Sequence, residues 1–247
     1  MNILAIIPTR AKSQGLPGKS VKPLNGKPLV QHTIDQARRV GLFKTIVVVS
    51  DGDTEMELAR KSGVFGIRKP EIIAGGDVPI EAVIEFVLKV LEKNGYTGYD
   101  AFCLLNPTSP LRGDSDIKEA VARFEKGSAI SVVSVVKRWP IIMRRVRNAK
   151  RGYWHCPGLS SQNRQARKPS YVQNGAIYIT RVDFFKDAKR LIGNRCYMHV
   201  MPDERSVDID TIWDFLAAEA YLQELDKASG TAAEFIAGLS EAAEPRA

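Results

Sequence analysis

The chain has 247 residues, of which 44% are hydrophobic and 26% charged, and its formal net charge is +8. These proportions are typical of a globular domain with a sizeable core, and no apolar run approaches the ~20 residues of a membrane span. The N-terminus lacks the charged start and long apolar run of a secretory signal. The three cysteines are odd in number and far apart, which favours a reducing cytoplasm over a disulfide framework. We therefore expect a cytoplasmic protein without a membrane segment.

The positive charge is concentrated in one segment. Between Lys137 and Lys168 there are ten basic residues and no acidic one, so the rest of the chain has 26 basic residues against 28 acidic ones. Such a patch suits nucleic acid, a membrane surface or a small anionic substrate, or it is a solvated arm without a partner. No DNA- or RNA-binding motif surrounds it, and we do not expect nucleic acid as a partner.

Apolar runs alternate with helical patterns along most of the chain. Strands buried on both faces are predicted at 3–7, 45–49 and 101–105, with a further β-branched strand at 130–136. Helices are predicted at 28–39, 56–61, 80–92, 114–124 and 212–225, and a last one at 231–239. The alternation predicts an α/β fold, a Rossmann-like, mainly parallel twisted sheet with helices on both faces. Acids at the start of the 114–124 helix, among them Asp116, are expected to cap it or to lie on the surface.

A glycine-rich basic loop follows the first strand. Thr9 to Leu24 reads TRAKSQGLPGKSVKPL, and glycines with cations after a buried strand form a cradle for phosphate. An ATPase-type P-loop is excluded, because its first glycine would fall on Ser13 and Pro23 delays the helix. The remaining alternative is an ordinary basic surface loop.

Four ordered blocks resemble one family. They are IIPTRAKSQGLPGKSVKPLNGKPLVQHTI at 6–34, NPTSPLR at 106–112, SQNRQARKPSYVQNGAIYI at 161–179 and DIDT at 208–211. Together they resemble the CMP-sialic acid synthetases (N-acylneuraminate cytidylyltransferases), a family that includes pseudaminic and legionaminic acid cytidylyltransferases. The resemblance covers 1–225 and implies a nucleotidyltransferase (GT-A-like) fold. Residues 226–247 are expected to form a C-terminal helical extension and a loose tail.

The resemblance assigns the nucleotide site. It implies that CTP is bound by Arg10, Ser13, Lys19, Ser20, Lys69 and Pro79, with Arg68 as the alternative to Lys69. Pro79 stands where the family tends to carry a serine or threonine, so that contact is missing or rebuilt. Further departures at Ala11, Lys12, Gln14 and Ser20 alter the phosphate loop.

The resemblance also assigns the sugar site. The residues implied are Asn106, Thr108, Ser109, Arg164, Gln165, Tyr171 and Asn174, and packing is an equally good explanation for Tyr171. Asn106 replaces the family's glutamine, which contacts the sugar, so the choice of sugar is expected to shift. The basic arm at about 137–170 corresponds to an insertion that crosses to a second subunit and lines its sugar site, which implies a homodimer.

Two aspartates predict a metal site. In an extended segment residues two apart share a face, so Asp208 and Asp210 can present their carboxylates together, an arrangement that needs a cation. Mg²⁺ takes carboxylate and phosphate oxygens, and the family uses these aspartates for the metal. The alternative is that Asp210 or Thr211 only caps the following helix.

The expected activity is therefore transfer of CMP from CTP to an acidic nonulosonic sugar with release of pyrophosphate. Arg10, Lys19, Asp208 and Asp210 are the expected catalytic residues. The alternatives are a relative that acts on pseudaminic, legionaminic or 3-deoxy-octulosonic acid, and a nucleotide-binding protein that has lost catalysis.

Overall fold

The computed structural model describes residues 1–11, 15–75, 78–139, 144–145, 154–155 and 168–242. The strands are β1 (Ile3–Pro8), β2 (Pro23–Leu24), β3 (Lys27–Pro28), β4 (Thr45–Ser50), β5 (Phe65–Arg68), β6 (Ala101–Leu105), β7 (Ser131–Arg138), β8 (Arg144–Arg145), β9 (Trp154–His155), β10 (Ser170–Arg181) and β11 (Cys196–Met201). The α-helices are α1 (Leu29–Val40), α2 (Asp53–Lys61), α3 (Ile80–Lys93), α4 (Asp114–Lys126), α5 (Val182–Ala188) and α6 (Ile212–Ala242). Short 3-10 helices cover η1 (Lys19–Val21), η2 (Glu71–Ile73) and η4 (Asp203–Arg205).

Seven strands form one sheet in the order β11-β7-β10-β6-β1-β4-β5. Every pairing in it is parallel except those of β10, which runs antiparallel to β6 and β7. The expected mainly parallel sheet is confirmed. The carboxyl ends of β1, β4 and β6 therefore meet at one edge, where an open α/β sheet binds its ligands.

Helices cover both faces of the sheet, as the alternation of strand residues requires. In β1, Ile3, Ala5 and Ile7 point into a core shared with α1, α2 and α4. The intervening Leu4 and Ile6 point into a second core shared with α3 and α5. A strand buried on both faces has no polar side to alternate with, which is why these runs read as continuously apolar.

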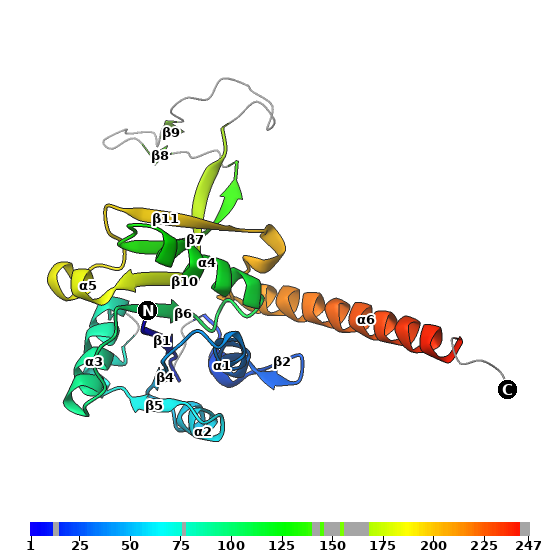
Figure 1. The fold of residues 1–247 in the computed structure, drawn as a ribbon, viewed down its shortest axis with the longest axis horizontal. Helices are drawn as coiled ribbons and strands as arrows, with labels where there is room; N and C mark the ends of the chain where they lie inside the picture. The colour runs from blue at the N-terminus through cyan, green and yellow to red at the C-terminus, as the bar shows by residue number, and fades with distance from the viewer. Residues whose placement is uncertain (12–14, 76–77, 140–143, 146–153, 156–167, 243–247) are drawn as a thin grey trace.

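A third, smaller hydrophobic core packs the segment around the start of α1 against the first turns of α6. Leu24 and Leu29 pack with Leu111, Ile209 and Phe215, so the first turns of α6 lie against the N-terminal loop. Beyond these turns α6 extends away from the sheet, as Figure 1 shows. This core places the segment before α6 beside the carboxyl ends of the central strands.

Two secondary-structure predictions were wrong. Ile67 and Arg68, expected in a loop, belong to β5, a short edge strand with only one buried residue and therefore a weak apolar signal. The two helices expected after residue 212 are one continuous helix, because Gly230 lies inside α6 without breaking it. The loose tail was predicted for 240–247, but residues 240–242 belong to α6, and residues 243–247 lie outside the described part of the chain.

Candidate active site

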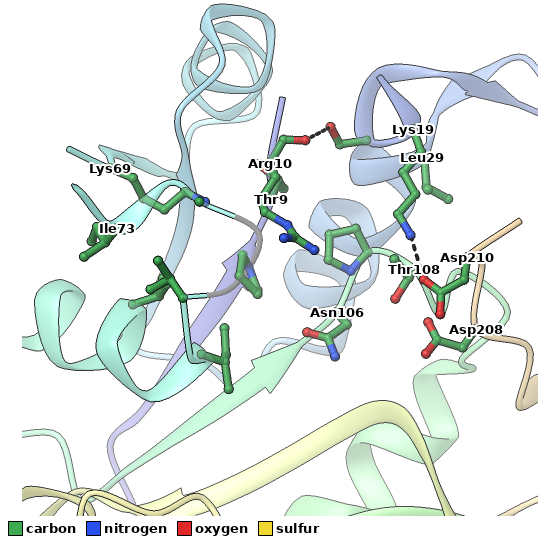
Figure 2. Close-up of a pocket in the computed structure, with 17 residues that line it drawn as sticks. Thr9, Arg10, Lys19, Leu29, Lys69, Ile73, Asn106, Thr108, Asp208 and Asp210 are labelled. Carbon is green, nitrogen blue, oxygen red and sulfur yellow. Dashed lines mark hydrogen bonds and ion pairs between the residues drawn. The ribbon is translucent and has the colours of Figure 1, made fainter. Parts of the chain in front are cut away.

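A cavity of about 280 Å³ lies at the carboxyl edge of the sheet. Figure 2 shows Lys69 and Ile73 on one side of it, Asp208 and Asp210 on the other, and Arg10 between them. The side near Lys69 is lined by the apolar residues Ile73, Val78, Ile80 and Val83. The cavity thus has an apolar end, a cationic middle and an end with two carboxylates.

The phosphate loop crosses from β1 to α1 and contacts the C-terminal segment. Lys19 Nζ donates hydrogen bonds to the carbonyl oxygen of Ile209 and to Asp210 Oδ1, the latter at 3.0 Å. Gly15 packs directly on this segment, since a Cβ atom there would lie 2.4 Å from the backbone oxygen of Asp210. The loop therefore brings Lys19 to the segment that carries the two carboxylates and is not a free surface loop.

Lys69 supplies a buried cation on the other side of the cavity. Its Nζ lies 3.7 Å from Asp51 Oδ1, and its side chain is 3% exposed. Burial lowers the pKa of Lys69, and the nearby Asp51 offsets only part of this effect. The alternative residue, Arg68, is exposed and pairs with Asp53, and it does not line the cavity. Lys69 is therefore the one of the two that lines the cavity.

Asp208 and Asp210 face the cavity from the segment before α6. Limited hydration within the cavity raises the pKa of Asp208, the charge of Asp210 raises it further, and a hydrogen bond from Thr108 acts in the opposite direction. The helix cap is made by other residues, because Thr211 Oγ1 accepts the Asp214 amide and Asp214 Oδ2 accepts the Thr211 amide. Thr211 and Asp214 therefore make the cap, while Asp208 and Asp210 line the cavity, where Thr108 and Lys19 contact them.

Comparison with known proteins identifies the family. Residues 4–191 match the family model described as cytidylyltransferase. The chain belongs to the cytidylyltransferase family. An N-acylneuraminate cytidylyltransferase of Streptococcus agalactiae serotype V is 31% identical over 90% of this chain and 54% of its own length. The chain thus spans about half the length of this relative.

Other relatives match over nearly all of their own length. The CMP-N,N'-diacetyllegionaminic acid synthase of Legionella pneumophila is 31% identical over 90% of this chain and 97% of its own. The pseudaminic acid cytidylyltransferase of Campylobacter jejuni serotype O:2 is 25% identical over 87% and 93%. Among solved structures, a CMP:2-keto-3-deoxy-manno-octonic acid synthetase complexed with CTP superposes with a TM-score of 0.66 at 17% identity, over 91% of this chain and 99% of that one. This last likeness concerns the fold.

Eight of the residues expected from the sequence line the cavity. They are Arg10, Lys19, Ser20, Lys69, Asn106, Thr108, Asp208 and Asp210. Ser20 borders the cavity, but its hydroxyl is turned inward, 2.5 Å from Glu55 Oε1 and 3.2 Å from the carbonyl oxygen of Arg10. Ser20 therefore braces the phosphate loop in addition to bordering the site.

Four other expected residues do not line the cavity. Pro79 is the residue before α3, between Val78 and Ile80, which do line it. Ser109 and Asn174 are buried, and Tyr171 is exposed on β10. Ser13, Arg164 and Gln165 lie outside the described residues.

Two buried charges were not expected. Glu55 is 2% exposed and lies against Gly52, where a Cβ atom would come within 2.1 Å of Glu55 Oε2. Glu55 is in the first turn of α2, where an acidic residue is usually exposed, so nothing in the local pattern indicated that its carboxylate is buried. Asp116, expected as a cap or on the surface, does cap α4 through the Gly113 amide at 2.8 Å but is only 3% exposed. Its other partners, Arg205 and His199, come from a distant part of the chain, which is why the surface assignment was wrong.

Arg112 is the largest of the buried charges. Its guanidinium donates to the carbonyl oxygen of Ala176 at 2.7 Å and to Gln36 Oε1 at 3.0 Å. Burial lowers the pKa of Arg112 to about 10. The side chain joins the loop after β6 to α1 and β10, so it fixes the turn that carries Asn106. The PTSPLR block contained this residue, but spacing alone did not assign it a role.

Proposed function

We propose that the chain activates an acidic nonulosonic sugar with CTP, giving the CMP-sugar and pyrophosphate. The observation that carries the proposal is the cavity in which Arg10, Lys19 and Lys69 face the same space as Asp208 and Asp210. Cations suit the triphosphate, and paired carboxylates suit a divalent ion bound to it. The names of the relatives, which act on N-acylneuraminic, legionaminic and pseudaminic acids, support an acidic sugar as the acceptor.

The reaction requires positioning and charge stabilisation rather than a protein nucleophile. The anomeric hydroxyl of the sugar attacks the α-phosphorus of CTP in line, forming the new P–O bond as the bond to pyrophosphate breaks. Negative charge on the phosphate oxygens is stabilised by Arg10 and Lys19. The apolar end beside Ile73 and Val78 suits a nucleobase, with the buried Lys69 at its edge.

The residues present fit Mg²⁺. The mutual repulsion that contributes to the raised pKa of Asp208 is relieved by a cation between the two aspartates. The described residues contain no group of three His, Cys, Asp or Glu side chains that could hold a metal, so the remaining ligands would be water and substrate phosphate, as Mg²⁺ prefers. When bound, Mg²⁺ supplies charge neutralisation and lowers the pKa of the attacking hydroxyl. Asp208 and Asp210 would hold it.

The basic arm completes the proposal as a homodimer contact. β7 and β10 continue as a paired ribbon beyond the other strands, with Ser170 opposite Arg138, and Figure 1 shows this ribbon projecting from the sheet. The segment from Lys137 to Lys168 lies largely outside the described residues, but its ten cations suit the carboxylate of a sugar bound by a second subunit. Among the described helices, none combines the length and apolarity needed to cross a membrane. We place the enzyme in the cytoplasm, where CTP is made.

The test is pyrophosphate release with CTP and Mg²⁺ over N-acetylneuraminic, legionaminic, pseudaminic and 3-deoxy-octulosonic acids. ATP, GTP and UTP are the nucleotide controls. Release with CTP and one sugar is expected, and it should disappear in Asp208→Asn combined with Asp210→Asn. CTP binding without turnover across the panel would instead support a nucleotide-binding protein that has lost catalysis. Full Mg²⁺-dependent release by the double variant would overturn the metal assignment.

A further inference from the structure

Strand β10 carries an irregularity beside the active site. Its pairing with β7 shifts register between Gln173 and Tyr178. Gly175 in this bulge has φ +75°, a conformation that favours glycine. The position of a Cβ atom on Gly175 would lie 3.2 Å from Asp208 Oδ2, so the bulge backbone touches one of the two cavity carboxylates. The irregularity therefore lies directly against a residue that lines the cavity.

The side chain of Asn174 holds this bulge from inside. It is 5% exposed, and its Oδ1 accepts a hydrogen bond of 2.6 Å from Ser134 Oγ on β7. Its Nδ2 donates to Ser206 Oγ at 2.9 Å and lies 3.3 Å from Met201 Sδ. Both ends of the amide are thus occupied within the protein, and the side chain does not line the cavity.

Ser206 opens the segment that carries the carboxylates. Its hydroxyl accepts the bond from Asn174 and donates to the carbonyl oxygen of Pro202 at 2.7 Å. Three residues further on, the Ile209 amide donates to the carbonyl oxygen of Thr108 at 2.7 Å. The segment with Asp208 is therefore tied at one point to β10 and at another to the turn after β6.

We propose that Asn174 is a positioning residue that holds the 206–210 segment, and with it Asp208 and Asp210, in the place where they bind a divalent cation. The inference rests on the proposed function, because it concerns the metal side of the same site. It replaces the expectation that Asn174 contacts the sugar. An amide with one acceptor and one donor suits the task, since it joins a hydroxyl donor on β7 to a hydroxyl acceptor on the segment.

Ser206→Ala is the cleanest perturbation. Replacement of Asn174 itself would also break its hydrogen bond with Ser134 on β7. Weaker Mn²⁺ binding would then not distinguish displaced carboxylates from a destabilised fold. The alanine at 206 removes the tie between Asn174 and the carboxylate segment, together with the short bond from Ser206 to the Pro202 carbonyl oxygen, and leaves the Asn174 N–H without its oxygen partner. Thr180→Val is the control. Thr180 is on β10, the strand that carries Asn174, and its buried hydroxyl donates to the Leu191 carbonyl oxygen away from the cavity.

The measurement is binding of Mn²⁺, followed by the electron paramagnetic resonance signal of the free ion, with thermal unfolding of each variant. Loss of the bond between Asn174 and Ser206 should weaken Mn²⁺ binding by Ser206→Ala roughly fivefold, while Thr180→Val, which loses a buried hydrogen bond elsewhere, binds Mn²⁺ as the unaltered chain does. Equal Mn²⁺ binding in both variants would overturn the positioning role and leave the proposed function intact. Absence of Mn²⁺ binding in the unaltered chain would overturn the metal assignment itself, and the inference with it.

Discussion

Replacement of Lys19 by methionine tests how the two ends of the chain are joined. The side chain of Lys19 is 13% exposed and donates to the Ile209 carbonyl oxygen and to Asp210, whose side chain is 75% exposed. A partly buried hydrogen bond from a charged donor contributes about 1.5–3 kcal/mol, whereas an exposed ion pair contributes about 0–1 kcal/mol. Lys19→Met keeps the apolar stem and loses both, so the free energy of unfolding should fall by about 2–3 kcal/mol.

The assay is thermal unfolding without nucleotide, with Asp210→Asn as the companion variant. At roughly 2–4 °C per kcal/mol for a chain of this size, Lys19→Met should lower Tm by roughly 4–12 °C. Asp210→Asn loses only the exposed charge and should lower the free energy of unfolding by less than about 1 kcal/mol. An equal loss in the two variants would refute the reasoning, because the exposed pair would then carry the effect attributed to the carbonyl bond.

Three further outcomes are expected. Gly175→Ala should destabilise the chain by about 1–2 kcal/mol in urea unfolding, since alanine resists a positive φ; unchanged stability would contradict the strained turn. Asp208→Asn should abolish turnover and yet raise the free energy of unfolding at neutral pH. Folding raises the pKa of this carboxyl group, so the ionised group costs stability once the pH exceeds its pKa in the unfolded chain. A variant less stable than the unaltered chain would contradict this reasoning. Burial alone would raise the pKa of Asp116, but hydrogen bonds from His199, Arg205 and the Gly113 amide outweigh it and hold that pKa well below its usual range. Asp116 therefore contributes stability above the ordinary carboxyl pKa of about 4, which is lost as the pH falls, and Asp116→Asn should flatten the acid side of the pH–stability curve.

The sequence predicted those features whose cause is local. The buried strands β1, β4 and β6 were visible because a strand covered on both faces must be apolar throughout. The shared face of Asp208 and Asp210 followed from the two-residue period of extended chain, and both line the cavity. The phosphate loop was visible from its glycines and cations.

What the sequence could not predict depends on partners far along the chain. Asn174 was expected at the sugar, but its amide is occupied by Ser134 and Ser206, which lie 40 and 32 residues away. Asp116 was expected to cap its helix or lie on the surface, because the residues near it give no sign of its ion pair with Arg205, which lies 89 residues later. Such pairings are set by how sheet and helices pack, and no local periodicity encodes them.

The hydrogen bond between Lys19 and Ile209 joins residues that the ribosome makes at very different times. Its two ends are 190 residues apart, so at ~5–20 residues per second a ribosome needs roughly 10–40 s to make the second after the first. Throughout that interval the phosphate loop has its cations but not the carboxylates that complete the site. A growing chain therefore contains the basic loop well before it contains the two aspartates that we propose as metal ligands. A chain truncated before residue 208 has the basic loop but never gains Asp208 and Asp210.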